Sequence, residues 1–370
     1  MPPVPTPDEE GDLDSVPSPR PVFHAEQALL GALLLQPHHR DNVNGIAAAA
    51  FSTAAHRSVF AAISTLPLPA PAEHAKTATW LSQVLTRARQ EVHGLSPVYL
   101  HTLIRACPQP DHAPAYARMV QGEHARRRLE GGAERLVRAA HDTALPDPVR
   151  AVLAEADALN AIVDNVAALF PPRSGTLPRT PAPSPVLFPD HAQAVEEEQL
   201  LLASATARPA AVESARWLLP ADFLRPLHAG LWQCLSAMVR RHEPVDPVTV
   251  LWEAQQRGLL DGGTEPAEVL GLLAGPYGAV DYWAERAVRR SLLATAVRVG
   301  SSIEAYARDP TASPFQLVVG ARRALADLGS VRTRWRHATE PIPSARSRPV
   351  PPARAGPPTT MTGRSTRGVR

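Results

Sequence analysis

Apolar residues recur at intervals of three and four along most of the chain, and this spacing predicts amphipathic helices. The first such segment begins near His24 and ends at Pro37, because proline cannot continue a helix. Its apolar stripe consists of four leucines: Leu29, Leu30, Leu33 and Leu34. Neither half of the chain shows the alternation of apolar and polar residues that marks a half-buried strand. The sequence therefore predicts an all-α fold.

The helical pattern occurs twice, at one constant spacing. The residues from Glu26 to Phe60 align without a gap with those from Glu198 to Trp232, so that each pair lies 172 positions apart. Matched pairs include Leu29 and Leu201, Pro37 and Pro209, Phe51 and Phe223, and His56 and His228. The alternative interpretation is two unrelated helices rich in alanine and leucine. Because the repeat length is that of a whole domain, we predict two tandem domains of one fold.

Prolines cluster where the two predicted domains begin and end. Residues 1–21 are proline-rich and acidic, and residues 171–190 form a proline-rich linker stiffened toward polyproline II. The predicted domains are small helical bundles at residues 22–170 and 191–330. Residues 331–370 are rich in arginine and proline, and we expect them, like residues 1–21, to be disordered.

Each predicted domain ends in a long helix, a turn with aspartate and proline, and a return helix. The long helices open near Tyr116 and Tyr282, and the return helices cover Val149–Leu169 and Phe315–Leu328. This order predicts one helical hairpin in each domain.

The formal net charge of +2 conceals an uneven distribution of charge. From residue 331 onward, nine arginines face a single acidic residue, Glu340. The acidic first segment is unlike a secretory signal, and no apolar run approaches the ~20 residues of a membrane span. The two cysteines fit a reducing compartment. These features predict a cytoplasmic protein without a membrane segment.

The motifs of common catalytic and metal sites are absent from the sequence. A phosphate-binding loop needs Gly-x-x-x-x-Gly-Lys-Ser/Thr, whereas Lys76-Thr77 follows Pro-Ala-Glu-His-Ala and no glycine. Neither His-Glu-x-x-His nor Cys-x-x-Cys occurs, and Gly300–Glu304 lacks the second glycine of a serine-hydrolase elbow. We therefore expect a non-enzymatic protein with no catalytic residue, no cofactor and no bound metal.

Arginines are the candidate partner contacts, since this residue is enriched at interface hot spots. The plainer interpretation of these residues is a solvated helix face. Three lie in the first hairpin and two in the second: Arg126, Arg127, Arg128, Arg289 and Arg290.

The start of the basic last segment supplies the candidate nucleic-acid contacts. There, arginines could bind phosphates without sequence preference and a tryptophan could stack on a base. A solubilising tail is the alternative. The residues are Arg332, Arg334, Trp335 and Arg336.

Six large side chains are predicted core anchors, three at equivalent places in each copy. For the two histidines we expect a hydrogen-bonded structural role beside the core, with a ligand or pH-switch role as the alternative. The six are Phe51, His56, Phe60, Phe223, His228 and Trp232.

These blocks resemble the N-terminal domain of DnaB-family replicative helicases. The likeness rests on Glu26–Leu34 and Phe51–Phe60 in the first copy, and on Asp222–Trp232 and Pro244–Val250 in the second. Two shorter blocks, Tyr116–Val120 and Gln256–Leu260, continue it. Together the resemblance covers about Phe23–Leu169 and His191–Leu328, most of the part that we expect to be ordered.

The two copies depart from each other at two places. Lys76–Thr79 stands where the second copy has Asp246–Thr249, which predicts a remodelled turn in the first copy. Ala203-Ser204 stands where the first copy has Gly31-Ala32, which predicts different helix packing.

The resemblance implies a small helical head with a hairpin, which in the helicase pairs into dimers, forms a collar on the hexamer and engages primase without catalysis. A RecA-like motor follows the head there, whereas a second head follows here. Our first hypothesis is a non-catalytic interaction module of DNA replication that binds primase, a replicative helicase or another copy of itself. The two heads could pair within one chain or form a homo-oligomer. The alternatives are a nucleic-acid-binding protein acting through its basic tail, with weak non-specific affinity, and an enzyme of unrecognised type.

Overall fold

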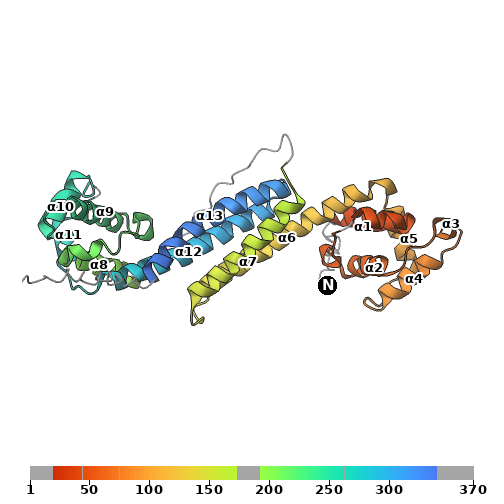
Figure 1. Cartoon of the computed structure of the whole chain (residues 1–370), viewed down its shortest axis with the longest axis horizontal. Coiled ribbons are helices and arrows are strands. Elements are labelled where there is room, and N and C mark those ends of the chain that lie inside the picture. The colour runs from red at the N-terminus through yellow and green to blue at the C-terminus, as the bar shows by residue number, and fades with distance from the viewer. Residues whose placement is uncertain (1–19, 44, 75, 173–191, 262, 340–370) are drawn as a thin grey trace, which may run out of the picture.

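The computed structural model describes residues 20–43, 45–74, 76–172, 192–261 and 263–339, and every regular element in these ranges is a helix. The predicted all-α fold is therefore confirmed. Figure 1 shows an elongated molecule, with a group of short helices at either end and a bundle of long helices between them.

The short helices of each half form a compact unit, which we call the first head and the second head. The first head contains α1 (Pro21–Leu35), η1 (Pro37–Val43), η2 (Ala48–Ala50), α2 (Ala54–Thr65), α3 (Pro71–His74), α4 (Thr79–Arg89), α5 (Pro97–Arg105) and η3 (Pro110–His112). The second head contains α8 (Ala192–Ala207), η4 (Pro209–Val212), η5 (Pro220–Asp222), α9 (Pro226–Arg240), α10 (Pro247–Gln256) and α11 (Pro266–Leu273). The η elements are short 3₁₀ turns.

A helical hairpin follows each head, as the sequence predicts. The first consists of α6 (Ala113–His141) and α7 (Pro148–Leu169), and the second of α12 (Val280–Arg308) and α13 (Pro314–Thr339). α6 and α12 each contain 29 residues, and both begin slightly before the tyrosines that mark their predicted starts. The two hairpins pack against each other in the centre of the molecule, so the two heads point in opposite directions (Figure 1).

The last helix corrects one expectation. Residues 331–339 were expected to be disordered, but they continue α13 to Thr339. The physical reason is burial: Val331 is 5% exposed, and Trp335 packs against the core shared by the hairpins and the second head. The remainder of that basic stretch, residues 340–370, lies outside the described ranges. So do residues 1–19 of the predicted N-terminal segment, residues 173–190 of the predicted linker, and His191.

The turn before α4 differs from its counterpart before α10, as the sequence predicts. The Asp246 carboxylate accepts hydrogen bonds from the backbone amides of Val248 (2.8 Å) and Thr249 (3.0 Å). The Thr249 hydroxyl accepts in return from the Asp246 amide at 2.9 Å, which completes a capping box. At the start of α4, Ala78 offers no side chain that can cap the helix.

Helix packing also differs at the second place where the copies depart. A Cβ atom on Gly31 of α1 would lie 2.9 Å from the Cys107 Cβ and would overlap the Leu103 carbonyl oxygen, so only glycine allows this approach. In the second head, the neighbouring hydroxyl of Ser204 accepts a hydrogen bond from the Gly278 amide at 2.9 Å.

The apolar core is divided differently from the sequence repeat. One cluster of buried side chains lies inside the first head and includes the start of α6, as far as Val120. The other runs through the whole second head and continues through both hairpins, from Ala125 of α6 to Val331 of α13. The first hairpin therefore shares its core with the second half of the chain. None of the helices in the described ranges is long and apolar enough to cross a membrane.

Candidate partner interface

The two hairpins meet at equivalent residues of α6 and α12. Ala133 lies 20 positions after the start of α6, and Gly300 lies 20 positions after the start of α12. A Cβ atom on Gly300 would lie 3.0 Å from the Ala133 carbonyl oxygen and closer still to Val137. Contact between counterparts is the mark of a two-fold symmetric pair. The hairpin seam, as we call this α6–α12 contact, is thus a pseudo-symmetric interface built within one chain.

Arg126 of α6 closes one end of the hairpin seam. Its guanidinium donates to the carbonyl oxygens of Ala307 (2.9 Å), Asp309 (2.6 Å) and Ala312 (2.7 Å), where α12 ends and the turn begins. The last carbonyls of a helix have no partner within the helix, and its C-terminus attracts a positive charge. The Arg126 Nε also lies 3.3 Å from the Glu123 carboxylate. One side chain therefore satisfies three carbonyls of the opposite half.

Arg308 adds a second polar contact at the same end. Its Nε donates to Glu130 of α6 at 2.9 Å, and its Nη2 lies 3.6 Å from Glu134. The Arg308 side chain is 58% exposed, so these ion pairs add little stability and serve mainly to set which surfaces match.

The opposite end of the hairpin seam is apolar. Counted from the starts of α6 and α12, the counterparts of Arg126 and Glu130 are Leu293 and Val297. Leu293 packs against the core, and Val297 is buried. The seam is therefore symmetric in its geometry and asymmetric in its chemistry.

Two ion pairs join the outer helices of the hairpins, each with its aspartate on α7 and its arginine on α13. Asp157 of α7 pairs with Arg332 of α13 at 2.5 Å, and Asp164 of α7 pairs with Arg322 of α13 at 2.9 Å. Acidic residues thus come from the first half and basic residues from the second.

Each head contains a buried glutamate–histidine pair at the 172-residue spacing. The His56 Nδ1 lies 2.6 Å from the Glu26 carboxylate, and the His228 Nδ1 lies 2.8 Å from the Glu198 carboxylate. Both glutamates are at most 1% exposed. In each head the second carboxylate oxygen accepts from a backbone amide at 2.7 Å, that of Ser52 or its counterpart Leu224. Sequence reasoning missed this role, although an acidic residue at the same place in two apolar helices was a usable signal.

The third partner of the buried carboxylate differs between the heads. In the first head, the Ser52 hydroxyl donates to Glu26 at 2.8 Å. In the second head, Arg290 of α12 donates to Glu198 at 2.5 Å. In the first head, burial, and secondarily the Glu26 charge, raise the pKa of the nearby Tyr99 hydroxyl above its ordinary value.

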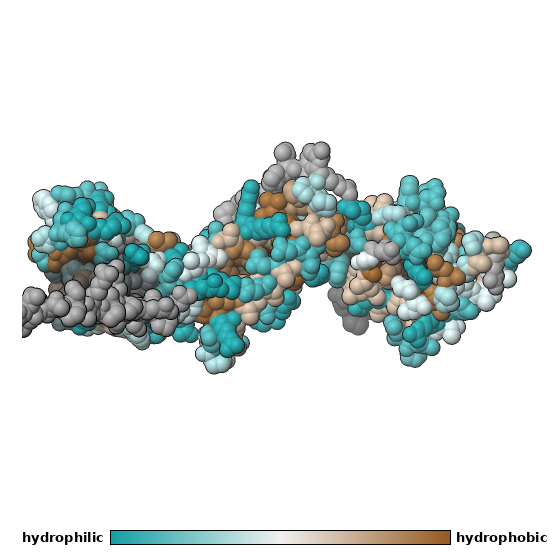
Figure 2. Space-filling model, in the orientation of Figure 1, coloured by the Kyte–Doolittle hydropathy of each residue, from teal (hydrophilic) through white to brown (hydrophobic). Residues whose placement is uncertain are grey.

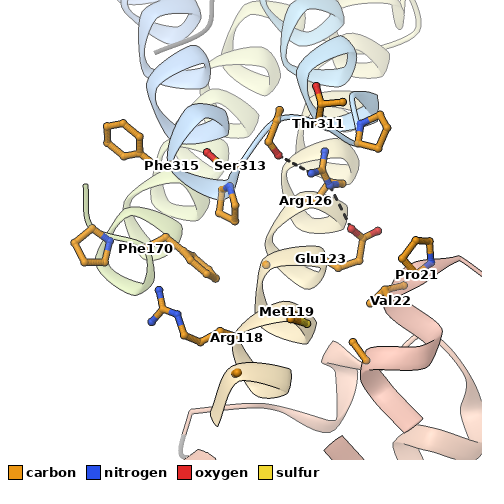
Figure 3. Close-up of a pocket in the computed structure, with 17 residues that line it drawn as sticks. Pro21, Val22, Arg118, Met119, Glu123, Arg126, Phe170, Thr311, Ser313 and Phe315 are labelled. Atoms are coloured by element: carbon orange, nitrogen blue, oxygen red, sulfur yellow. Dashed lines mark hydrogen bonds and ion pairs between the residues drawn. The ribbon is translucent and has the colours of Figure 1, made fainter. Parts of the chain in front are cut away.

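A pocket of about 670 Å³ lies where the first head meets the tip of the second hairpin (Figure 3). Arg118, Met119, Glu123 and Arg126 of α6 line one side of it. The Arg118 guanidinium sits 5.3 Å from the centre of the Phe170 ring. On the face of the molecule in Figure 2, brown apolar residues are visible along the central bundle among teal polar ones. The pocket joins three parts of the chain, and its described lining residues include one exposed methionine and no unpaired buried charge.

The structure does not bring the five candidate partner-contact arginines together. Arg126 binds the second hairpin, Arg127 donates to the Ala50 carbonyl oxygen at 2.5 Å, and Arg290 binds Glu198. Arg128 is half-buried on α6 and Arg289 is exposed on α12. Three of the five therefore hold contacts inside the chain, and contact with another protein stays a prediction for all of them.

The candidate nucleic-acid contacts also make internal contacts. Arg332 pairs with Asp157, and Arg334 lies 2.6 Å from the buried carboxylate of Asp222. Trp335 is half-buried against the core, and Arg336 is exposed. Nucleic-acid contact by these residues stays a prediction.

The six predicted anchors lie in or beside the cores of the heads. The Phe51 and Phe60 rings are 4.7 Å apart between centres, and the Phe223 and Trp232 rings are 5.9 Å apart. Five of the six side chains are buried, and Phe223 is half-buried: Phe51, His56, Phe60, His228 and Trp232 make up the five.

Comparison with known proteins identifies both heads. A family model for the DnaB-like helicase N-terminal domain matches residues 19–122 and 190–285, one stretch in each half and more than half of the chain together. The chain belongs to the DnaB-like helicase N-terminal domain family. The family match occurs twice, so the predicted tandem duplication is confirmed.

A replicative DNA helicase, DnaB of Geobacillus stearothermophilus, is 31% identical over 122 residues. The aligned region covers 32% of this chain and 27% of the helicase, so the chain spans about a quarter of that relative's length. The likeness to DnaB is thus confined to a part of the helicase, and both family matches are to its N-terminal domain.

Proposed function

We propose that this protein is a non-catalytic interaction module of DNA replication that presents two DnaB-type heads from a single chain. The observation that carries the proposal is the hairpin seam. It pairs the two hairpins inside the chain and leaves both heads pointing outward at opposite ends (Figure 1). Such a chain can bind one partner at each end, or two copies of one partner.

The chemistry of the hairpin seam favours pairing of unlike hairpins. In a pair of two second hairpins, Arg308 would face Val297 instead of Glu130. The carbonyls that Arg126 binds would face Leu293, and unpaired buried carbonyls are costly. In a pair of two first hairpins, Val166 and Ala156 of α7 would stand where Arg332 and Arg322 of α13 now stand. Each half therefore matches the other half better than it matches itself.

Tethering adds to this preference. Two binding surfaces on one chain meet at an effective concentration that can reach the millimolar range when the linker spans them. Pairing within the chain then competes well against pairing between chains. We accordingly propose a monomer with a closed hairpin seam, and not a homo-oligomer built by hairpin exchange.

The proposed partners are primase and a replicative helicase of the same cell. An exposed tryptophan on the second head, Trp252 of α10, is 62% accessible and lies one turn from the exposed Val248. The corresponding positions of α4 carry Ala78 and Ser82, so this surface is present on one head alone. Tryptophan is enriched at interface hot spots, which makes Trp252 the first position to test.

The test is direct binding of the full chain to purified primase and to the purified helicase hexamer, each measured by biolayer interferometry. We expect saturable binding to one of the two and a loss of affinity of about tenfold or more in Trp252→Ser. Val98→Ser is the matched control, because Val98 is a 72% exposed apolar residue on the first head. Binding of neither protein in the micromolar range would overturn the proposal.

We also expect no ATP turnover by the purified chain, since Lys76 has no phosphate-binding glycine loop.

A further inference from the structure

A groove of about 1170 Å³ lies on the second head, outside the hairpin seam. Its walls come from the segment between η4 and η5, from α9 and from the end of α13. Trp217, Arg216 and Arg240 line it, together with His337 of α13. We call it the Trp217 groove.

The extra length of the last helix supplies one residue of the groove, His337. α13 contains 26 residues and α7 contains 22. The additional turn carries His337 to the second head, where the ion pair of Arg334 with buried Asp222 holds it in place. The position that matches Trp217 at the 172-residue spacing is Gly45. The first head therefore lacks both the aromatic wall and the helix end that form the groove.

The charge of the Trp217 groove is positive. Arg216 and Arg240 are both exposed, and neither has an ion-pair or hydrogen-bond partner among the described residues. Arg257, also in the lining, pairs with Glu253 at 2.7 Å. Glu213 is the acidic residue of the lining, and it is exposed. Two unpaired guanidinium groups beside one carboxylate suit an anionic ligand, because arginine binds phosphates and carboxylates well.

An aromatic side chain lines the same groove. Trp217 is half-buried against the core and lines the groove. The Trp232 indole donates to the Leu218 carbonyl oxygen at 3.2 Å, which fixes the backbone next to Trp217. A tryptophan held in this way can stack on a nucleic-acid base, and stacking of this kind tolerates any base.

The combination of positive charge and an aromatic ring favours one class of ligand. Guanidinium groups bind phosphates and carboxylates alike, but the tryptophan beside them suits a ligand that also carries a flat ring. A nucleic-acid strand supplies phosphates and bases together, whereas an acidic peptide supplies carboxylates without a base.

From these observations we infer that the Trp217 groove binds single-stranded nucleic acid, with a base stacked on Trp217 and backbone phosphates at Arg216 and Arg240. The groove lies on the second head and away from the hairpin seam, so this inference stands or falls independently of the proposed protein partners.

The test is fluorescence anisotropy of the full chain with a labelled oligothymidylate over a series of salt concentrations. We expect Arg216→Ala combined with Arg240→Ala to weaken binding at least tenfold at low salt. The magnitude of the salt slope should fall by about 1.4, since each phosphate contact to a single strand contributes roughly 0.7. Trp217→Ala should weaken binding about tenfold with little change in the slope.

The matched control removes the same charge elsewhere. Arg105→Ala combined with Arg150→Ala deletes two exposed arginines of the first half and should leave the affinity within about twofold of the parent. The inference is overturned if this control weakens binding as much as the groove variant does, or if the groove variant binds like the parent. It is also overturned if poly-glutamate competes equally well and Trp217→Ala has no effect, because the groove would then serve acidic peptides. Circular dichroism melting of each variant checks that it is folded.

Discussion

The heads of the two halves share one fold and one buried glutamate–histidine pair. The other partners of the buried glutamate differ between the heads. Glu26 in the first head is satisfied by a histidine, a backbone amide and a serine hydroxyl. Glu198 in the second head receives an arginine from α12 in place of the serine. The duplicated positions therefore keep the geometry of the head, while the third partner of the buried carboxylate differs between the halves.

The same contrast extends to the hairpins and the cores. In the first half, aspartates of α7 pair with arginines of α13 in the second half. Arg126 of α6 donates to carbonyl oxygens at the end of α12. The first head keeps a core of its own, whereas the second head shares its core with both hairpins. The first head is thus an appended unit, and the second head is continuous with the centre of the molecule.

The largest effect should come from removing the large ring in each head. Phe60→Ala and Trp232→Ala should each cost about 3–5 kcal/mol, because both rings are at most 4% exposed. Phe60→Ala should separate the unfolding of the first head from the rest, since that head has its own core. Trp232→Ala should lower the transition of the second head and both hairpins together. Urea unfolding followed by circular dichroism checks this. A single common unfolding transition in Phe60→Ala would show that the two cores are not separate. Val98→Ala, a change at an exposed residue of the first head, is the control and should leave the unfolding unchanged.

The next effect concerns the buried carboxylates. Glu198→Gln should cost about 3 kcal/mol or more, because it leaves the Arg290 charge without its partner on Glu198. Glu26→Gln should cost about 1–3 kcal/mol. The groups that lose a charged acceptor there are the Ser52 hydroxyl and amide and the His56 ring, and no arginine is left without a partner. Combining Glu198→Gln with Arg290→Gln should recover part of the loss. Equal costs for the two single changes, measured by urea unfolding, would contradict the difference between the heads.

A smaller effect should follow from closing the space at the hairpin seam. Gly300→Ala should destabilise the chain by about 1–3 kcal/mol, because the added Cβ meets the Ala133 carbonyl oxygen. Gly329→Ala in α13 is the matched control, since nothing lies within 4 Å of its added Cβ. That control should be neutral or stabilising by up to about 1 kcal/mol. Thermal unfolding of the two variants tests whether α6 and α12 pack as closely as described.

The smallest predicted effect is a pH dependence confined to the first hairpin. Burial, and then the charges of Arg127 and Arg128, lower the pKa of His124 below its ordinary value. The unfolded chain then binds the proton more readily, so this residue makes the protein less stable as pH falls below about 6.5. Its counterpart in α12 is Ser291, which does not titrate in this range. His124→Gln should therefore reduce the fall in melting temperature between pH 7 and pH 5. An unchanged fall would show that His124 does not contribute to the pH dependence.

Local patterns predicted most of the fold, and non-local contacts account for what they missed. The 172-residue spacing placed Phe60 and Trp232 at one position, and both are buried. Proline at the start of α5 and α11 marked helix starts that the structure shows. By contrast, the arginines from residue 332 onward look like a solvated tail in the sequence. The partners of Arg332 and Arg334 are Asp157 and Asp222, which lie more than 100 positions away, and no local pattern connects them.

The site was less predictable than the fold for the same reason. The arginine runs on α6 and α12 were visible in the sequence, but their partners were not. Arg126 meets carbonyls of residues 307, 309 and 312, which depend on how the two hairpins cross. The crossing itself depends on Gly300, one glycine among many in the sequence.

The two hairpins pair with each other within one chain. A protease site placed between residues 173 and 191 allows this pairing to be tested: the purified protein is cut there, and the particle mass is measured by chromatography with light scattering. Both fragments should elute together as one particle with the mass of the intact chain, 39.7 kDa. Fragments that separate, or that each pair with a copy of themselves, would contradict it.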